Sequence, residues 1–182
     1  MIDNTLVKGF LEDKDDSLKI NLEKVPDVKN CIIINLNGYV DTYNSAYFQK
    51  QMGKIIEANF VNIICNSYNL NYVSSTGIGL FTDFLKMIKE KGGDLVLLNV
   101  QPKVYEVFQL LGFSQLFNFK ENLNDSVEFF KKREAGGGNV FPRVLSCPVC
   151  SHRLKATKSG RFRCAECKSI ISIDEGGNAV LG

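Results

Sequence analysis

Four cysteines near the C-terminus constrain the fold of this chain more than any other feature. Cys147, Cys150, Cys164 and Cys167 read C-x2-C-x13-C-x2-C. Each C-x2-C pair closes a tight knuckle that aims two thiolates at one ion, and the two pairs together supply the four sulfurs that tetrahedral Zn²⁺ prefers. Four unrelated core thiols would have no reason to pair twice at this spacing. The spacing therefore predicts a four-sulfur zinc site.

Iron is the alternative metal for such a site. The C-P-x-C start at Cys147 is shared with rubredoxin-like iron sites, but Ser151 and Lys168 stand where those knuckles usually have glycine. Side chains at these positions leave less room for backbone N–H groups to approach the sulfurs. The sequence therefore favours Zn²⁺ over iron.

The composition divides the chain into two parts. Residues 1–142 are rich in Ile, Leu, Val and Phe and are long enough to bury a core. Residues 143–182 have few large apolar side chains and cannot fold on hydrophobic burial alone, so a bound metal must supply the difference. We expect a domain over residues 1–134, a glycine-rich linker over residues 135–142 and a zinc ribbon over residues 143–182.

The charge divides in the same way. The chain carries a formal net charge of +2, but residues 143–168 hold seven basic side chains and the single acid Glu166, whereas residues 1–142 are slightly acidic. The ribbon could bind nucleic acid, with Arg161 and Arg163 on phosphates and Phe162 stacked on a base. It could equally dock a protein, or be a solvated surface with no partner.

Aliphatic runs and helical patterns alternate over the first 134 residues. Residues 31–36, 61–65 and 95–100 are typical of strands covered on both faces, and residues 17–22 predict an antiparallel edge strand. Helical patterns cover residues 47–58, 78–91, 104–111 after Pro102, and 124–134, with a short apolar segment at 116–119. This order predicts an α/β domain with a mostly parallel sheet, whose functional loops follow the carboxyl ends of the strands. Residues 66–77 are the loop that this rule indicates.

That loop contains three consecutive hydroxyl side chains, Ser74, Ser75 and Thr76, directly before a helical pattern. A hydroxyl at this place can accept the N–H groups of the first helical turn. Alternatively, an exposed hydroxyl could accept a phosphoryl group where the helix dipole tolerates negative charge. Capping needs one hydroxyl and leaves two spare, so both interpretations stand.

Further motifs follow one another in the same region: Gly38-Tyr39-Val40-Asp41-Thr42, residues 72–79, Lys91-Gly92-Gly93-Asp94-Leu95-Val96-Leu97, Pro102-Lys103-Val104 and Leu110-Leu111-Gly112-Phe113. Together they resemble the STAS domain of bacterial anti-sigma factor antagonists over roughly residues 17–134. The resemblance implies a STAS-like, mostly parallel sheet of four to five strands flanked by helices.

The resemblance also implies a cytoplasmic regulatory protein that is not an enzyme. Such a protein binds an anti-sigma factor that is also a serine kinase, and a sigma factor is released. Phosphorylation in the family's D-S-[ST]-G loop breaks the complex, and a PP2C-type phosphatase restores binding. The loop corresponds to residues 74–77, which makes Ser75 the implied phospho-acceptor and Thr76 the alternative. Ser74 stands where the family usually has Asp.

Some family members bind partners without being phosphorylated. The competing interpretation is therefore a nucleic-acid-binding or protein-docking protein that acts through the basic ribbon, with the STAS-like domain as a constitutive interaction platform.

The remaining candidates for chemistry are weak. His152 is the only histidine and follows a knuckle whose metal already has four sulfurs, so it is expected to be exposed. No P-loop or Ser-His-Asp arrangement can be assembled. Cys31 and Cys65 lie in apolar runs and are expected to be buried, inert thiols. We expect no signal peptide and no membrane-spanning segment, and a reducing cytoplasm suits the free thiols.

Overall fold

The computed structural model describes residues 2–136, 143–157, 160–173 and 179–181. The chain divides into two compact units, Met1–Lys131 and Lys132–Gly182. Each unit contains a hydrophobic cluster of its own. Throughout the described part of the chain, no helix has the length and apolar character needed to cross a lipid bilayer.

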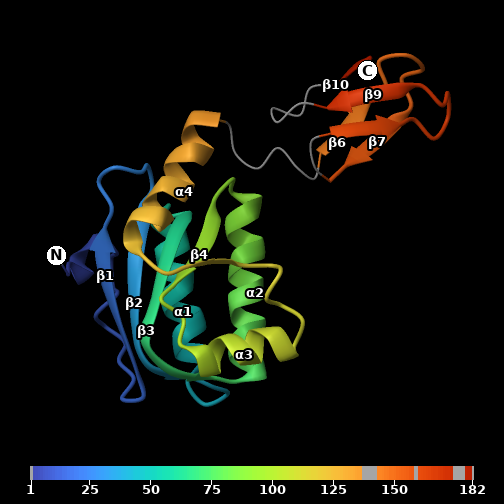
Figure 1. Ribbon diagram of the computed structural model, residues 1–182. Helices are drawn as coiled ribbons and strands as arrows, with labels where there is room; N and C mark the ends of the chain where they lie inside the picture. Colours follow the sequence, from blue (N-terminus) through green and yellow to red (C-terminus); the bar gives the residue numbers. More distant parts are fainter. Residues whose placement is uncertain (1, 137–142, 158–159, 174–178, 182) are drawn as a thin grey trace. The chain divides into compact units, whose positions relative to one another are not determined.

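A five-stranded sheet in the order β1-β2-β3-β4-β5 forms the centre of the first unit (Figure 1). β1 (Leu18–Lys24) pairs antiparallel with β2 (Cys31–Val40), which confirms the predicted edge strand. β3 (Asn62–Val73), β4 (Asp94–Leu98) and β5 (Asn118–Lys120) follow in parallel, as predicted for a mostly parallel sheet.

β3 is much longer than its sequence suggests. The aliphatic run ends at Cys65, and residues 66–77 were expected to form a loop, but the strand continues to Val73. The expectation was wrong because the later residues are not a polar loop: Ser67, Leu70 and Val73 are buried, and each pair of residues between them is exposed. Pairing with the second half of β2 supplies the backbone partners of this extension.

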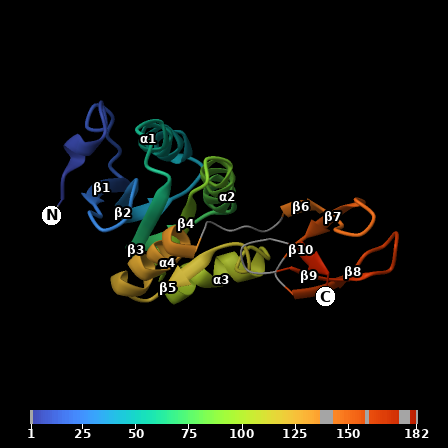
Figure 2. The ribbon, with the colours of Figure 1, turned by 90° about the horizontal axis from the view of Figure 1, so that it is seen from above.

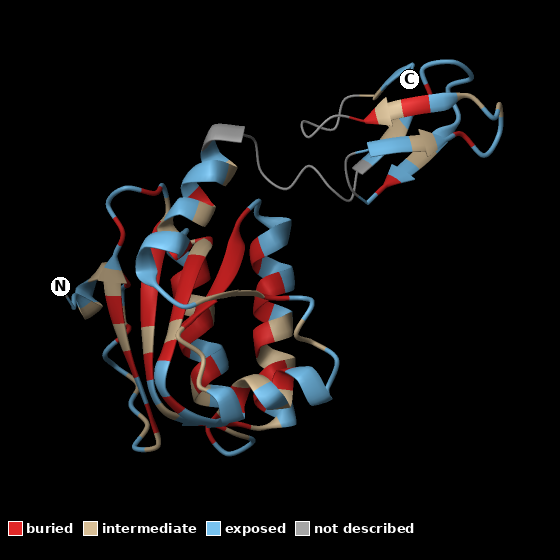
Figure 3. Ribbon diagram, viewed as in Figure 1, coloured by how far each residue is buried: buried red, intermediate tan, exposed pale blue. Residues whose placement is uncertain are grey.

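Three helices contribute to the core on one face of the sheet. They are α1 (Ser45–Glu57), α2 (Ser75–Glu90) and α3 (Pro102–Leu110). Phe48 of α1 and Phe81 of α2 meet in this core with their ring centroids 5.1 Å apart. Figure 3 shows buried residues recurring between exposed ones along α2, as expected for a helix with one buried face. The sequence predicted α2 only from Ile78, because its apolar periodicity begins there, whereas the helix begins three residues earlier.

α4 (Leu123–Gly136) covers the opposite face of the sheet (Figure 2). Its Phe130 packs in a second, smaller cluster with Cys31, Ile33 and Val96, among others. Cys31 and Cys65 are both buried, as predicted. Burial raises the pKa of the Cys65 thiol to about 12, so this thiol stays protonated at neutral pH.

The boundary between the units falls within α4, after Lys131. Because this helix runs to Gly136, the first two residues of the linker expected over residues 135–142 are helical. Residues 137–142 lie outside the described residues. The proposed domain boundaries therefore stay predictions.

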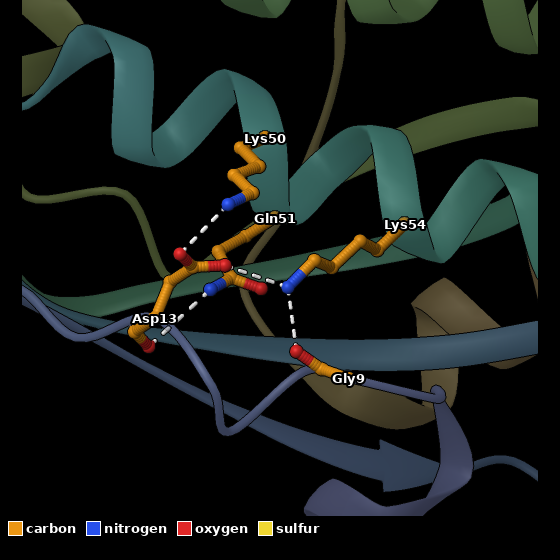
Figure 4. Close-up of polar contacts among 5 residues, drawn as sticks. All are labelled: Gly9, Asp13, Lys50, Gln51 and Lys54. Atoms are coloured by element: carbon orange, nitrogen blue, oxygen red, sulfur yellow. Dashed lines mark hydrogen bonds and ion pairs between the residues drawn. The ribbon is translucent and has the colours of Figure 1, made fainter.

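The segment before β1 packs along α1. It contains the short 3-10 helix η1 (Asn4–Leu6), and Phe10 is buried in the main core. The Asp13 carboxylate accepts hydrogen bonds from Lys50 at 2.8 Å and from Lys54 at 2.7 Å, which lie one turn apart on α1 (Figure 4). These two bonds hold the pKa of Asp13 below its usual range. The contacts attach the N-terminal segment to the helical layer.

The second unit contains two small antiparallel sheets. β6 (Arg143–Ser146) pairs with β7 (Arg153–Ala156), and β9 (Ile170–Ile173) lies between β8 (Gly160–Arg163) and β10 (Ala179–Leu181). The buried members of its core are few: Cys147, Ala156, Cys164, Ile171 and Ile173. This small core matches the expectation that hydrophobic burial contributes little here.

Two glycines provide a test of the fold. A Cβ at Gly93 would lie 1.9 Å from the carbonyl oxygen of Val61, whereas a Cβ at Gly53 in α1 would meet nothing within 4 Å. We expect Gly93→Ala to lower the free energy of unfolding of the first unit by about 1–3 kcal/mol, because the overlap displaces the backbone. Gly53→Ala should raise it by roughly 0.5–1 kcal/mol. Urea unfolding followed by circular dichroism measures both, and a Gly93→Ala protein as stable as the parent would contradict this close approach.

Candidate phosphoacceptor loop and metal centre

The predicted hydroxyl loop lies where β3 ends and α2 begins. Ser74 is the N-cap of α2, since its backbone is extended and its Oγ accepts the N–H of Gly77 at 3.1 Å. A serine hydroxyl satisfies this N–H as an aspartate carboxylate would. The replacement of the family's usual Asp by Ser74 therefore preserves the cap and removes one negative charge.

Ser75 and Thr76 are the two spare hydroxyls, and both are exposed. Ser75 is the first residue of α2, and its side chain makes no hydrogen bond within the described residues. The Oγ1 of Thr76 lies 3.2 Å from the Oγ1 of Thr42, which follows β2. The Ser75 hydroxyl is therefore accessible and unengaged, whereas Thr76 contacts the neighbouring loop.

Gly77 allows the first turn of α2 to approach the strand ends closely. A Cβ at this position would lie 2.9 Å from a methyl group of Val40 and 2.9 Å from a methyl group of Val73. A larger residue would push α2 away from the sheet. Close packing of α2 against the strand ends therefore explains why this position of the loop motif is a glycine.

The loop after β2 is held by Asn44, which the sequence analysis missed. This side chain is only 2% exposed. Its Nδ2 donates to Ser17 Oγ and to the Tyr39 carbonyl oxygen, both at 2.8 Å, and its Oδ1 accepts the N–H of Asp41 at 3.0 Å. The only signal in the sequence is an Asn directly before a helical pattern, which is too common to indicate such a role.

Exposed tyrosines flank the two loops. Tyr43, directly after Thr42, is 96% exposed, and Tyr39 and Tyr72 are exposed register partners on β2 and β3. Exposed aromatic side chains are enriched at the centres of protein interfaces. Three exposed tyrosines therefore lie in or next to the segments that hold Thr42 and Ser75.

The structure brings the four predicted metal ligands together. The Sγ atoms of Cys147 and Cys167 lie 3.7 Å apart, as do those of Cys150 and Cys164. All four sulfurs lie within 4.8 Å of one another. Zn–S bonds of about 2.3 Å in a regular tetrahedron place the sulfurs about 3.8 Å apart. The cluster therefore fits one tetrahedral ion.

The two knuckles share one backbone conformation. The N–H of Ser151 donates to the Cys147 carbonyl oxygen at 2.9 Å, and the N–H of Lys168 donates to the Cys164 carbonyl oxygen at 3.1 Å. Ser151 and Lys168 have left-handed φ values of 60° and 64°. Glycine adopts such φ values more readily than other residues, and glycine is the residue that iron knuckles usually have at these two positions.

The environment of the sulfurs differs between the knuckles. Ser169 accepts a hydrogen bond from the Cys167 sulfur at 3.4 Å, and its contacts lower the pKa of that thiol to about 6. At Cys150 the His152 backbone favours the thiolate, but desolvation and the other three sulfurs outweigh it and raise the pKa of the thiol to about 12. Metal binding requires both thiols to be deprotonated. His152 is exposed, as expected for a knuckle residue outside the four-sulfur set.

The basic side chains that the structure describes in the ribbon lie on its outside. Arg161 and Arg163 alternate along β8 and are exposed, while Phe162 between them is half-buried and packs on the small core. Alternate residues of a strand point to opposite faces. The Phe162 ring therefore does not share a surface with the two arginines, and the base-stacking role considered for it is not supported.

Comparisons with known proteins identify the first unit. A family profile described as the STAS domain matches residues 19–126, which is more than half of the chain. The chain belongs to the STAS domain family. A second profile, described as a domain of unknown function (DUF8512), matches residues 144–182, which include all four clustered cysteines.

Several relatives of this STAS protein are anti-sigma factor antagonists. The anti-sigma-B factor antagonist of Bacillus subtilis is 26% identical over 111 residues, which cover 61% of this chain and 100% of that protein. The anti-sigma F factor antagonist of Paenibacillus polymyxa is 25% identical over 52% of this chain and 81% of that protein.

A solved structure of an anti-sigma factor antagonist from Mycobacterium paratuberculosis shares the fold. Its TM-score is 0.56 at 13% identity, and the match covers 65% of this chain and 97% of that one. The STAS-like α/β architecture expected from the motifs is therefore confirmed.

The cap assignment leads to a stability prediction. Ser74→Ala should lower the free energy of unfolding of the STAS domain by about 1 kcal/mol, because the Gly77 N–H loses its acceptor. Ser74→Asp should retain the stability, and Ser75→Ala is the matched control because its hydroxyl is exposed and unbonded. Thermal unfolding compares the three variants. Equal stability of Ser74→Ala and Ser75→Ala would contradict the cap.

Proposed function

We propose that this chain is an anti-sigma factor antagonist whose binding is switched by phosphorylation of Ser75. Its partner is an anti-sigma factor that is also a serine kinase, and a PP2C-type phosphatase reverses the modification. The observation that carries this proposal is the exposed, unbonded Ser75 hydroxyl at the start of α2, beside the Ser74 cap. The STAS domain acts as a binding protein, not as an enzyme. The cytoplasmic location expected from the sequence stays a prediction.

The position of Ser75 explains how a phosphate could act without disturbing the fold. A phosphoserine carries about −1.5 to −2 charges at neutral pH. In the free protein, the helix N-terminus favours such charge by roughly 0.3–1 kcal/mol. In a docked complex the same charge must be desolvated, which costs several kcal/mol if it is unpaired. Phosphorylation should therefore weaken the complex and leave the free domain folded.

The loss of the aspartate at position 74 makes the loop less acidic. An Asp at the cap would repel a phosphate on the next residue, whereas the neutral Ser74 does not. Charge repulsion within the phosphorylated loop is consequently weaker here than in a D-S-[ST]-G loop. The kinase that modifies it must recognise the loop without that carboxylate.

The switch is tested by affinity capture from native cells with three forms of the full chain: the parent, Ser75→Asp and Ser75→Ala. We expect the parent and Ser75→Ala to capture a serine kinase of the anti-sigma factor class. Ser75→Asp should capture at least tenfold less, since about 1.4 kcal/mol suffices for that factor. Equal capture by Ser75→Asp and the parent would contradict the switch. Phosphorylation of the Ser75→Ala protein at an undiminished level would contradict Ser75 as the acceptor and leave Thr76 as the alternative.

A second candidate function places the partner on the ribbon. The observation that favours it is the exposed pair Arg161 and Arg163 on one outer face of β8. In this case the ribbon binds nucleic acid or an acidic protein, and the STAS domain is a constitutive platform. An Arg161→Glu/Arg163→Glu protein distinguishes the two functions in the same capture experiment. Loss of the partner in this variant, together with no effect of Ser75→Asp, would favour the ribbon.

We further propose that the cysteine cluster holds Zn²⁺. The sulfur separations near 3.7 Å and the four-thiolate donor set support this assignment, since soft thiolates in a tetrahedron suit zinc. The left-handed Ser151 and Lys168 stand where iron knuckles usually have glycine, which favours zinc over iron. The ion would also offset the scarcity of buried apolar side chains in this unit.

Elemental analysis of the full chain purified without added metal tests the site. We expect one zinc per chain in the parent, loss of zinc in Cys164→Ser and full retention in His152→Ala. The histidine variant is the control because His152 is exposed and outside the sulfur set. Iron in place of zinc would overturn the metal assignment, and loss of zinc in His152→Ala would overturn the ligand set.

A further inference from the structure

The unequal lengths of β3 and β4 leave a hollow at one edge of the STAS sheet. The two strands pair as far as Asn66 and Leu98, after which β3 continues to Val73 with β2 alone. The chain after β4 turns into α3 instead of following β3. The hollow at this divergence has a volume of about 590 Å³. This volume lies within the range of small-molecule sites.

Aromatic rings line much of this hollow: Tyr68 of β3, Tyr105 of α3 and Phe119 of β5. Tyr105 and Phe119 form an edge-to-face pair with ring centroids 4.9 Å apart, which fixes one wall. Tyr68 is 63% exposed and contacts no other ring within the described residues. A planar ring could stack on Tyr68, because aromatic faces prefer offset stacking or edge contacts with another ring.

Two side-chain amides that line the hollow, those of Asn99 and Gln101, have unused hydrogen-bonding groups. Gln101 donates its Nε2 to the Tyr68 carbonyl oxygen at 2.7 Å, which leaves its Oε1 as an acceptor. The Asn99 backbone is held by its N–H bond to the Lys120 carbonyl oxygen at 2.9 Å. Its side-chain amide makes no hydrogen bond within the described part of the chain and offers both a donor and an acceptor.

The charge of the hollow is balanced. Apart from the tyrosines, the ionisable side chains in the lining are Lys120 and Glu121, which carry opposite charges. Lys120 also lies over the Phe129 ring, with its Nζ 5.9 Å from the centroid. A charged ligand would therefore gain little net attraction here, whereas an uncharged ligand loses less hydration on binding.

We propose that this hollow binds a small, uncharged planar ring compound with an amide-type edge. The ring lies against Tyr68 and the wall formed by Tyr105 and Phe119, and its amide edge exchanges hydrogen bonds with Asn99 and Gln101. No residue that lines this hollow belongs to the serine loop. A failure of this site would therefore leave the proposed switch untouched, and the reverse also holds.

Titration of the isotope-labelled full chain with benzamide, followed by NMR, tests the site. We expect saturable shifts of the backbone signals of Tyr68, Asn99 and Gln101, with a Kd in the millimolar range that is ordinary for so small a ligand. Benzoate should bind at least several-fold more weakly because it is charged, and cyclohexanecarboxamide should do so because it lacks an aromatic ring. Tyr68→Ala should weaken benzamide binding at least fivefold, while Tyr43→Ala is the matched control and should leave it unchanged.

Both tyrosines are exposed, so neither substitution threatens the fold. An absence of saturable shifts at these residues would overturn the proposal, as would Tyr68→Ala binding equal to the parent. Equal binding of benzoate would overturn the preference for an uncharged ligand. Equal binding of cyclohexanecarboxamide would overturn the stacking role.

Discussion

The parallel pairing of β2 with β3 determines where the functional groups of the STAS domain lie. The register runs from Cys31 opposite Asn62 to Val40 opposite Val73, so that both strands end at the same edge of the sheet. The N–H of Ser74 then donates to the Val40 carbonyl oxygen at 2.9 Å, which fixes the point where α2 begins. This arrangement places Thr42 next to Thr76 and leaves Ser75 exposed. The pairing of two distant segments therefore creates the proposed switch.

The two units reach stability by different means. The STAS domain buries a continuous aliphatic and aromatic core that includes fully buried Phe48 and Ile55. The ribbon has few such residues and instead brings four thiol groups within 4.8 Å of one another. Four thiolates at this spacing would repel one another without a cation between them. The metal is thus expected to contribute most of the folding free energy of the ribbon.

The order of the elements, the mostly parallel sheet and the cysteine cluster could be predicted from the sequence, whereas some long-range contacts could not. The buried strands were recognisable because Ile32, Ile34 and Ile63 lie in aliphatic runs, and the spacing of the cysteines indicated their clustering. The extension of β3 through Tyr68 was missed, because its polar residues pair with a strand about 30 residues earlier. The hollow at Tyr68 depends on that extension and on α3, so no local pattern indicated it. Asn44 was missed for the same reason, since its partners Ser17 and Tyr39 belong to other segments.

Mapping of phosphate by mass spectrometry on the chain isolated from its native cells tests the central claim most directly. The free chain and the chain bound to its anti-sigma factor are separated first and then digested and analysed. The account predicts phosphate on Ser75, or on Thr76 as the alternative, in the free fraction and none at either residue in the bound fraction. Phosphate at neither residue in both fractions, or equal phosphorylation of Ser75 in the free and bound chains, would contradict it.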